Sequence, residues 1–337
     1  MVSVALAGVV LGPGTGWSYW TAQALGWGTA GTGTLTDPSG VTATAASDTV
    51  GVAWTASSGP SGDPEGGYFV TRVRVSDGAE APACGTSPLS PTATVTCQDT
   101  SVPDGTYRYR VTAVHHSWTA QSDLSTQTTV DTAPPAAPSA PQLLPSSDTG
   151  DSSSDRITSD ATPTFTGTAE PGALVTIYSS GVVAGSAAAD EGGGYTITAA
   201  TLADGALTIT AKAMDAAGNT SPESGGTPVT VDTVRPTVTV SQAAGQADPS
   251  NTQPVGFTVT FSEPVVGFTT GDLTLSGPAG AFASMSGTGS SYDVSVSGMT
   301  ADGEVNLSVG ADVAFDVAGN GNSASTGDGS VTRDTTA

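Results

Sequence analysis

An aspartate-threonine pair ends a strand-like run at three places in this chain, and its even spacing constrains the fold more than any other feature. The pairs are Asp131-Thr132, Asp232-Thr233 and Asp334-Thr335, so the repeat lengths are 232 − 131 = 101 and 334 − 232 = 102 residues. A second pair, Asp-Gly, recurs at nearly the same spacing and begins at residues 104, 204 and 302. A repeat of this length is the size of one small β-sandwich. The sequence therefore predicts three similar modules in series.

The repeat divides the 337 residues into a leader, residues 1–36, and three modules, at 37–131, 132–232 and 233–337. The second module opens on a Pro-rich connector, residues 132–147, which favours extended polyproline geometry. Apolar residues do not recur at helical spacing over more than two turns, whereas period-two alternation recurs between clusters of Gly, Pro, Asp and Ser. We therefore expect an all-β chain of three tandem antiparallel β-sandwiches in an elongated array.

The charge balance excludes some partners. The 31 acidic and 8 basic residues give a net charge of −23 and are spread along the whole chain. A surface of this sign repels phosphate backbones and anionic headgroups, so we expect no nucleic acid and no peripheral membrane binding. It attracts cations and keeps an extended protein soluble, which favours a monomeric array. The sequence does not name the partner, which we expect to be a surface protein or a glycan.

Two cysteines, Cys84 and Cys97, lie 13 positions apart in the first module. As free thiols they would be small core residues, and as a disulfide they would stabilise the module by about 3 kcal/mol. The spacings typical of thioredoxin-like and zinc sites are absent. We favour the disulfide, which indicates an oxidising, extracytoplasmic setting.

The leader also indicates export. Val2 to Leu11 is an uninterrupted run of apolar and small residues, and Ala22-Gln23-Ala24 offers a signal peptidase a small-x-small site. No Lys or Arg occurs before Arg72, so the basic start of a signal peptide is missing. We interpret the leader as an export signal or membrane anchor whose start has been trimmed, and the alternative is an apolar leader with no targeting role. The final Asp334-Thr-Thr-Ala repeats a junction that elsewhere opens a module, which favours a fragment of a longer array.

Catalytic patterns are weak. The two histidines, His115 and His116, are neighbours in one strand and point to opposite faces, so they cannot serve one triad. The Gly-rich stretches lead into strands rather than helix N-termini, which excludes a phosphate-binding loop. A glycosidase pair of carboxylates needs a cleft that small sandwiches in series do not offer. We therefore expect no enzymatic activity.

Two strand-like runs characterise the first module: an early one carries Trp54, and a later one reads Gly105-Thr-Tyr107-Arg-Tyr109-Arg-Val111. With this pattern the module resembles a fibronectin type III domain. The resemblance implies that either Tyr107 or Tyr109 makes the corner hydrogen bond of that fold, while the intervening arginines, Arg108 and Arg110, face solvent.

The other two modules resemble the bacterial Ig-like repeats of large surface adhesins. The second carries Thr-Phe-Thr-Gly-Thr-Ala-Glu-Pro from residue 164, Leu-Ala-Asp-Gly from residue 202 and Asp215-Ala-Ala-Gly-Asn219. The third shares Ala301-Asp-Gly303 and Asp316-Val-Ala-Gly-Asn320 and is similar to another branch of the same family. The resemblance implies Ig/fibronectin-III-like sandwiches throughout the chain.

One acidic segment is a candidate metal site. Residues 148–160 combine hydroxyl side chains with four aspartates, Asp148, Asp151, Asp155 and Asp160, a composition that suits a hard cation. The spacing is not that of an EF-hand, but the resemblance implies Ca²⁺ near the junctions between modules. Asp148 and Asp155 match the entry motif of that family, and the plausible companions are Asp131, Asp215 and Asp232. The alternative is that these side chains only stabilise turns by bonding nearby amides.

These observations lead to one functional hypothesis and two alternatives. We expect a non-enzymatic, exported surface stalk or adhesin with calcium-stiffened junctions. The first alternative is a spacer or carbohydrate-binding accessory region of a secreted polysaccharide-degrading enzyme. Every tryptophan lies at or before Trp118, which argues against glycan binding by the last two modules. The second alternative is protein recognition by the loop from Ser57 to Gly67.

Overall fold

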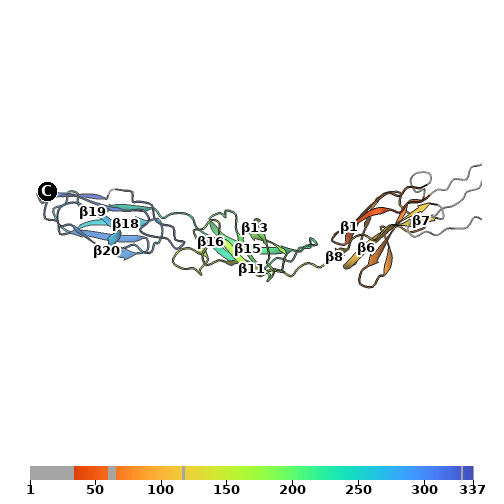
Figure 1. Ribbon diagram of the computed structural model, residues 1–337. Coiled ribbons are helices and arrows are strands. Elements are labelled where there is room, and N and C mark those ends of the chain that lie inside the picture. Colours follow the sequence, from red (N-terminus) through yellow and green to blue (C-terminus); the bar gives the residue numbers. More distant parts are fainter. Residues whose placement is uncertain (1–33, 60–65, 116–117, 328, 337) are drawn as a thin grey trace, which may run out of the picture. The chain divides into compact units, whose positions relative to one another are not determined.

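The computed structural model describes residues 34–59, 66–115, 118–327 and 329–336 (Figure 1). Regular structure in these ranges consists of 23 β-strands and one short 3₁₀-helix, η1 (Thr270–Asp272). The prediction of an all-β chain is confirmed. No helix among the described residues is long and apolar enough to cross a membrane.

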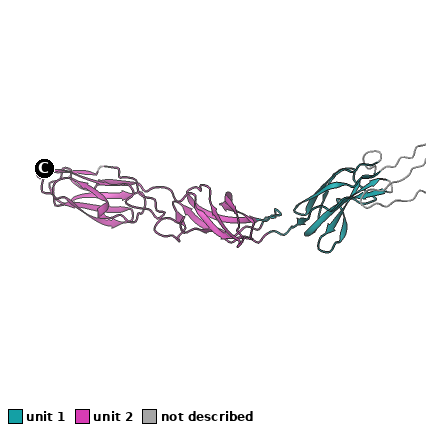
Figure 2. Cartoon of the chain, in the orientation of Figure 1, with its two compact units in different colours: residues 1–134, 214–220 teal, residues 135–213, 221–337 magenta. Residues whose placement is uncertain are grey.

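The chain forms two compact units (Figure 2). The first contains residues up to 134 together with 214–220, and the second contains residues 135–213 and 221–337. The proposed leader lies outside the described residues, apart from its last three positions. Of these, Leu35 is buried in the core of the first module, so that core begins slightly before the residue 37 expected from the sequence.

The first module is a two-sheet sandwich with the sheet orders β1-β2-β5 and β4-β3-β6-β7, and β8 pairs with β6. Its core contains the predicted Trp54, which lies edge-on to Tyr68 with ring centroids 5.4 Å apart. The strands are β1 (Ser39–Ala46), β2 (Thr49–Thr55), β3 (Tyr68–Arg74), β4 (Glu80–Ala83), β5 (Thr96–Asp99), β6 (Gly105–His115), β7 (Trp118–Gln121) and β8 (Thr128–Val130).

Alternation along β6 buries Tyr107 and Tyr109 and leaves Arg108 and Arg110 half-buried. The Tyr107 hydroxyl donates to the carbonyl of Pro103 at 2.9 Å, so Tyr107 makes the corner hydrogen bond. The hydroxyl of Tyr109 instead donates to the Asp99 carboxylate at 3.0 Å. Burial, and then the negative charge of Asp99, raise the pKa of Tyr109.

The predicted disulfide joins Cys84 and Cys97, whose Cα atoms are 5.8 Å apart. Asp99 lies beside this disulfide. Its side chain is buried and accepts a hydrogen bond from the Cys84 amide at 3.1 Å. Asp99 also forms an ion pair with Arg72 at 2.8 Å. The carboxylate therefore fixes three neighbours, and this network explains how a charged residue is accommodated in the core.

The second module has the sheet orders β10-β16-β15-β12-β13 and β14-β11-β9. Strand β10 pairs in parallel with β16, which brings the Asp148–Asp160 segment beside the end of the module. The core between the sheets includes Phe165, Ile177 and Ile209. The strands are β9 (Gln142–Leu143), β10 (Ile157–Thr158), β11 (Thr164–Thr168), β12 (Leu174–Ser179), β13 (Val182–Ala188), β14 (Gly194–Thr198), β15 (Gly205–Met214) and β16 (Thr227–Val231).

The third module has the sheet orders β17-β18-β21-β20 and β19-β22-β23. Its core holds an aromatic group in which Phe268 contacts Phe261 and Tyr292 edge to face, with centroids 5.1 and 5.0 Å apart. The strands are β17 (Val238–Gln242), β18 (Val255–Phe261), β19 (Leu273–Ser276), β20 (Phe282–Thr288), β21 (Ser291–Ser297), β22 (Gly303–Val309) and β23 (Ser330–Arg333).

The two repeated pairs found in the sequence, Asp-Thr and Asp-Gly, contact each other in every module. Thr132 donates its amide and its hydroxyl to Asp104 at 2.9 and 2.8 Å. Thr233 makes the same two bonds to Asp204, at 3.0 and 2.9 Å. Thr335 donates to Asp302 through the same groups, both at 3.0 Å. The repeat therefore encodes a clasp that fastens the last strand of each sandwich to the start of an earlier strand.

Candidate functional site at the handover from the second to the third module

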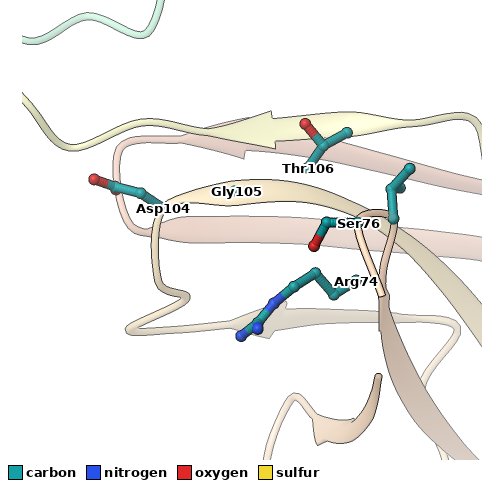
Figure 3. A pocket seen from close by; sticks show the side chains of 6 residues that line it. Arg74, Ser76, Asp104, Gly105 and Thr106 are labelled. Atoms are coloured by element: carbon teal, nitrogen blue, oxygen red, sulfur yellow. The ribbon is translucent and has the colours of Figure 1, made fainter. Parts of the chain in front are cut away.

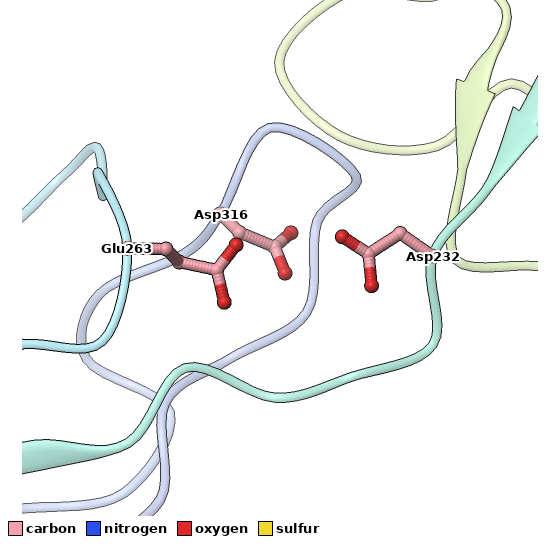
Figure 4. A group of neighbouring side chains, drawn as sticks. All are labelled: Asp232, Glu263 and Asp316. Carbon is pink, nitrogen blue, oxygen red and sulfur yellow. The ribbon is translucent and has the colours of Figure 1, made fainter. Parts of the chain in front are cut away.

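Three carboxylates lie close together at the junction between the second and third modules. Asp232 follows β16, Glu263 follows β18, and Asp316 lies in the loop after β22. One carboxylate oxygen from each lies within 4.8 Å of the others (Figure 4). Asp316 is 1% exposed, and the other two side chains are partly buried. All three belong to the second compact unit, so the group lies within one body of the structure.

The turn Asp316–Asn320 positions Asp316 and connects it to the linker. The Asp316 carboxylate accepts the amide and the side-chain nitrogen of Asn320, both at 2.9 Å. The same Asn320 side chain donates to the carbonyl of Asp232 at 2.7 Å. The carboxylate of Asp232 in turn accepts the amide of Val234 at 3.0 Å. One asparagine therefore couples the turn of the third module to the last residue of the second.

The loop that precedes β10 packs against the same turn. The Thr149 hydroxyl donates to the carbonyl of Ala318 at 2.6 Å. Gly150 lies so close that a Cβ atom there would collide with the carbonyl of Val317, and a Cβ at Gly319 would lie 2.8 Å from the Gly150 amide nitrogen. Gly150 and Gly319 have φ angles of +93° and +92°. Both positions therefore require glycine, for their backbone conformation and for the close approach.

The surroundings of Glu263 disfavour its charged form. Desolvation raises the pKa of Glu263, and the charges of Asp316 and Asp232 raise it further. Glu263 accepts no hydrogen bond from the described residues, so its oxygens remain free for another ligand. A raised pKa beside two like charges is typical of a group that gains from binding a positive ion.

Comparison with known families shows what these modules are. Residues 135–233 match a family described as a bacterial Ig-like domain, and residues 232–332 match a second family with the same description. The chain contains two adjacent bacterial Ig-like domains. Their shared boundary falls at residues 232–233, so the carboxylate group lies where the first Ig-like domain ends and the second begins.

Solved structures with tandem domains are also similar to this chain. The FN1–FN3 domains of chicken CNTN1 are 15% identical, with 88% of this chain and 97% of that chain covered and a TM-score of 0.24. A tetra-tandem repeat from the extending region of a large adhesion protein is 18% identical, with 88% and 74% covered and a TM-score of 0.27. Fibronectin(III)-like modules of Clostridium thermocellum CbhA are 17% identical, with 59% and 94% covered and a TM-score of 0.33. A search of curated proteins found no match. These scores are too low to add to the argument, which depends on the family matches and on the sandwiches themselves.

Sequence reasoning anticipated Asp232 but missed its two partners. The signals that could have found them are the Glu-Pro dipeptide at residue 263, which repeats Glu170-Pro171, and the Asp-x-Ala-Gly-Asn turn at residue 316. Neither dipeptide nor turn suggests a ligand by itself. Their proximity arises within the third module, where Val266 pairs with Phe315 across a long stretch of sequence, and a linear pattern does not show it.

The aspartates of the 148–160 segment do not converge on one point among the described residues. Their oxygens bond locally: Asp148 accepts the amide of Arg156, Asp155 that of Ile157, and Asp160 the amide and hydroxyl of Thr162. Asp151 is exposed. One Asp148 oxygen, Oδ1, is buried and has no hydrogen-bond partner among the described residues. The segment therefore stabilises its own turns and the contact with the third module, and Asp148 keeps one buried acceptor.

The remaining candidates, Asp131 and Asp215, lie in the first compact unit. Asp215 accepts the amide and the side-chain nitrogen of Asn219, both at 2.8 Å, and Asn219 donates to the carbonyl of Asp131 at 2.9 Å. Desolvation acts to raise the pKa of Asp215, but the hydrogen bonds from Asn219 and Ala217 outweigh it and the pKa is lowered. The described residues bring no third acid to these two.

Other surface features offer less chemistry. A hollow on the first module is lined by Arg74, Val75, Ser76, Asp104, Gly105 and Thr106 (Figure 3). The Asp104 carboxylate there is already bonded to Thr132, and Arg74 lies 3.5 Å from Asp77. His115 is buried as expected for a packed strand residue, whereas His116 lies outside the described residues, as does most of the proposed recognition loop from Ser57 to Gly67. The carboxylate group of Asp232, Glu263 and Asp316 is therefore the best candidate site in the described part of the chain.

Proposed function

We propose that this chain is a non-enzymatic structural array of an exported bacterial surface protein, and that Ca²⁺ stiffens the joint between its two Ig-like domains. The observation that carries the proposal is the structure of the junction between the second and third modules. Asn320, Thr149 and the Gly150–Gly319 contact fix the two domains against each other, and three acids meet at that joint. A spacer needs a defined angle between successive domains, and a cation at the joint would hold that angle.

The donor set fits calcium. Ca²⁺ takes six to eight oxygen ligands in flexible geometry, about 2.3–2.6 Å away, whereas Mg²⁺ demands a near-ideal octahedron. The three carboxylates offer up to six oxygens, several of which also accept hydrogen bonds, and waters would complete the shell. Burial is the main cause of the raised pKa of Glu263, and a bound cation would offset the added repulsion from Asp316 and Asp232. Asp232 and Asp316 would then act from the two sides of the joint.

A second cation position is proposed at the 148–160 segment. The support is the buried Oδ1 of Asp148, which lacks a partner among the described residues. A buried acceptor without a partner is destabilising, so a cation or a water at this point would stabilise the loop. Because Thr149 follows directly, ordering of Asp148 would also tighten the contact with Ala318.

Export is supported by the disulfide and by the charge. A bond between Cys84 and Cys97 persists in an oxidising compartment, and a net charge of −23 suits a crowded, hydrated surface. Glycan binding has less support, because a flat, exposed tryptophan is absent from the described residues: Trp54 is buried and Trp118 packs partly on the core. We therefore favour a spacer that displays other parts of its protein.

Small-angle X-ray scattering tests the stiffening. We expect calcium to narrow the pair-distance distribution of the chain and chelator to broaden it. The Glu263→Gln chain should stay broad in calcium, whereas Glu304→Gln, which removes an exposed charge from β22 of the same domain, should behave like the parent. A parent distribution that is identical with calcium and with chelator contradicts the calcium part of the proposal.

Surface display is tested separately with intact cells of the source bacterium. We expect external protease to remove the chain, detected by antibody, without cell lysis. Protection from protease until the cells are lysed would contradict export, whatever the scattering shows.

A further inference from the structure

Strand β20 (Phe282–Thr288) is an unprotected edge of the third module. It ends the sheet β17-β18-β21-β20 and pairs only with β21, in a continuous register from Phe282↔Ser297 to Thr288↔Ser291. No described backbone group outside this sheet bonds to its outer side. In an antiparallel pair every second residue directs its N–H and C=O away from the partner strand. The outer side of β20 therefore presents a row of unpaired donors and acceptors.

Several other edges among the described strands carry devices that block strand addition. At the opposite edge of the same sheet, Val240 of β17 bonds to the carbonyl of Thr326. In the second module, Ala184 of the edge strand β13 accepts the amide of Ala200. Strand β4 contains a glutamate and a proline, and β1 is interrupted by a register shift near its start. Charge, proline, bulges and cover are the usual protections of edge strands.

Strand β20 has none of these protections. Its sequence, Phe-Ala-Ser-Met-Ser-Gly-Thr, contains no charge and no proline, and its pairing shows no bulge. The inward-facing Ala283 and Met285 pack against the core, so the strand is held in place. Phe282 is 58% exposed. The strand is therefore anchored to the core by its inward-facing side chains, while its outer edge is unpaired.

The charge pattern selects the partner. The chain carries a net charge of −23, yet the 20 residues from Leu273 to Tyr292 contain no charged side chain and are flanked by Asp272 and Asp293. Two copies of this chain repel each other over most of their surfaces, and this stretch is where they can approach without like charges facing each other. An edge strand is also self-complementary under a twofold axis, because the same donors and acceptors meet on both sides.

We propose that β20 pairs antiparallel with β20 of a second copy of this chain and so joins the two four-stranded sheets into one. With the twofold axis at Met285, Ser284 faces Ser286 of the second copy, and Phe282 faces Thr288 of the second copy. The main-chain hydrogen bonds supply the affinity, as in other cases of strand addition. This pairing revises the expectation of a monomeric array.

The contact is small, and its strength follows from its size. Two seven-residue strands bury less than the roughly 1,200 Å² of a standard stable interface, so dimerisation is weak and concentration-dependent. A dissociation constant between about 10 µM and about 1 mM is expected. Copies displayed side by side on one surface would reach such local concentrations, since tethering raises the effective concentration.

Sedimentation velocity across that concentration range tests the pairing. The parent chain should shift from monomer towards dimer as its concentration rises. The double variant Ser284→Glu, Ser286→Glu places like charges opposite each other and should remain monomeric. The variant Asn306→Glu, Ser308→Glu adds the same charge to exposed positions of β22, a central strand of the other sheet, and should dimerise like the parent.

Charge reversal provides the rescue. The double variant Ser284→Lys, Ser286→Lys should also be monomeric alone, and a mixture of the glutamate and lysine variants should form a one-to-one dimer. Circular dichroism and the melting temperature of each variant check that it is folded. A parent that stays monomeric at every concentration, or a β20 glutamate variant that is folded and dimerises like the parent, overturns the proposal.

Discussion

The turns Asp215–Asn219 and Asp316–Asn320 have the same internal structure but different surroundings. In both, the aspartate accepts the amide and the side-chain nitrogen of the asparagine, and the asparagine donates to the carbonyl of a linker aspartate. Asp215 is nevertheless partly exposed, whereas Asp316 is buried. The turn is a locally encoded unit, and the environment around it comes from elsewhere in the chain.

That environment is the segment that precedes β10. Thr149 and Gly150 cover the turn of the third module, where Gly319 packs against Gly150. The equivalent glycine of the other turn, Gly218, has open space where a Cβ would lie. At the covered turn Glu263 completes the acidic group, whereas the described residues bring no third acid to Asp131 and Asp215. The comparison shows that a repeated motif can lie in two different environments, depending on what packs on it.

Replacing the turn glycines by alanine should give the largest difference between the two turns. Both have similar positive φ angles, +91° at Gly218 and +92° at Gly319, so each alanine variant loses about 1 kcal/mol of stability through its backbone conformation. Gly319→Ala also clashes with the Gly150 amide and should lose about 1–3 kcal/mol more. Denaturant unfolding measures both variants, and equal losses would show that the covering segment does not pack as described.

Removing the Thr149 hydroxyl should have a smaller effect. Thr149→Val leaves the carbonyl of Ala318 without its donor and the amide of Ser159 without its acceptor, and it should reduce the stability of the second compact unit by about 1–2 kcal/mol. The matched control is Thr260→Val on β18, where the exposed hydroxyl makes no hydrogen bond to the described residues. Calorimetry of the parent and both variants checks the effect. If both variants melt alike, the Thr149 bond contributes nothing.

The sequence was sufficient for the modules and insufficient for the joint. The Asp-Thr and Asp-Gly landmarks, the alternating strands and the Tyr-x-Tyr run of β6 are local patterns, and each found its place in the structure. The 148–160 segment was predicted to be a metal site, and the structure does not bring its four aspartates together. They bond neighbouring amides instead, because an aspartate two residues before an amide satisfies it at short range. Glu263 approaches Asp316 through long-range pairing within the third module, where Val266 bridges Phe315, and such pairing has no local signal.

The pH dependence of the joint should be the smallest effect. The folded-state pKa of Glu263 is raised, so in the absence of a cation its contribution to stability is fully present below its unfolded-state pKa and is lost as pH rises through the folded value. Chelated protein should therefore lose a little stability as pH rises from about 4.3, the ordinary glutamate pKa. The Glu263→Gln variant should lack this component. A difference between the two proteins that does not change with pH would show that Glu263 is not coupled to Asp232 and Asp316.

Calcium titration by isothermal calorimetry tests the central claim, that the covered turn forms a cation site and completes the joint. The parent chain and Glu304→Gln should bind calcium with equal stoichiometry, and Glu263→Gln should lose one equivalent while remaining folded. A parent chain that binds no calcium, or a Glu263→Gln chain that binds it with unchanged stoichiometry and affinity, would contradict the account.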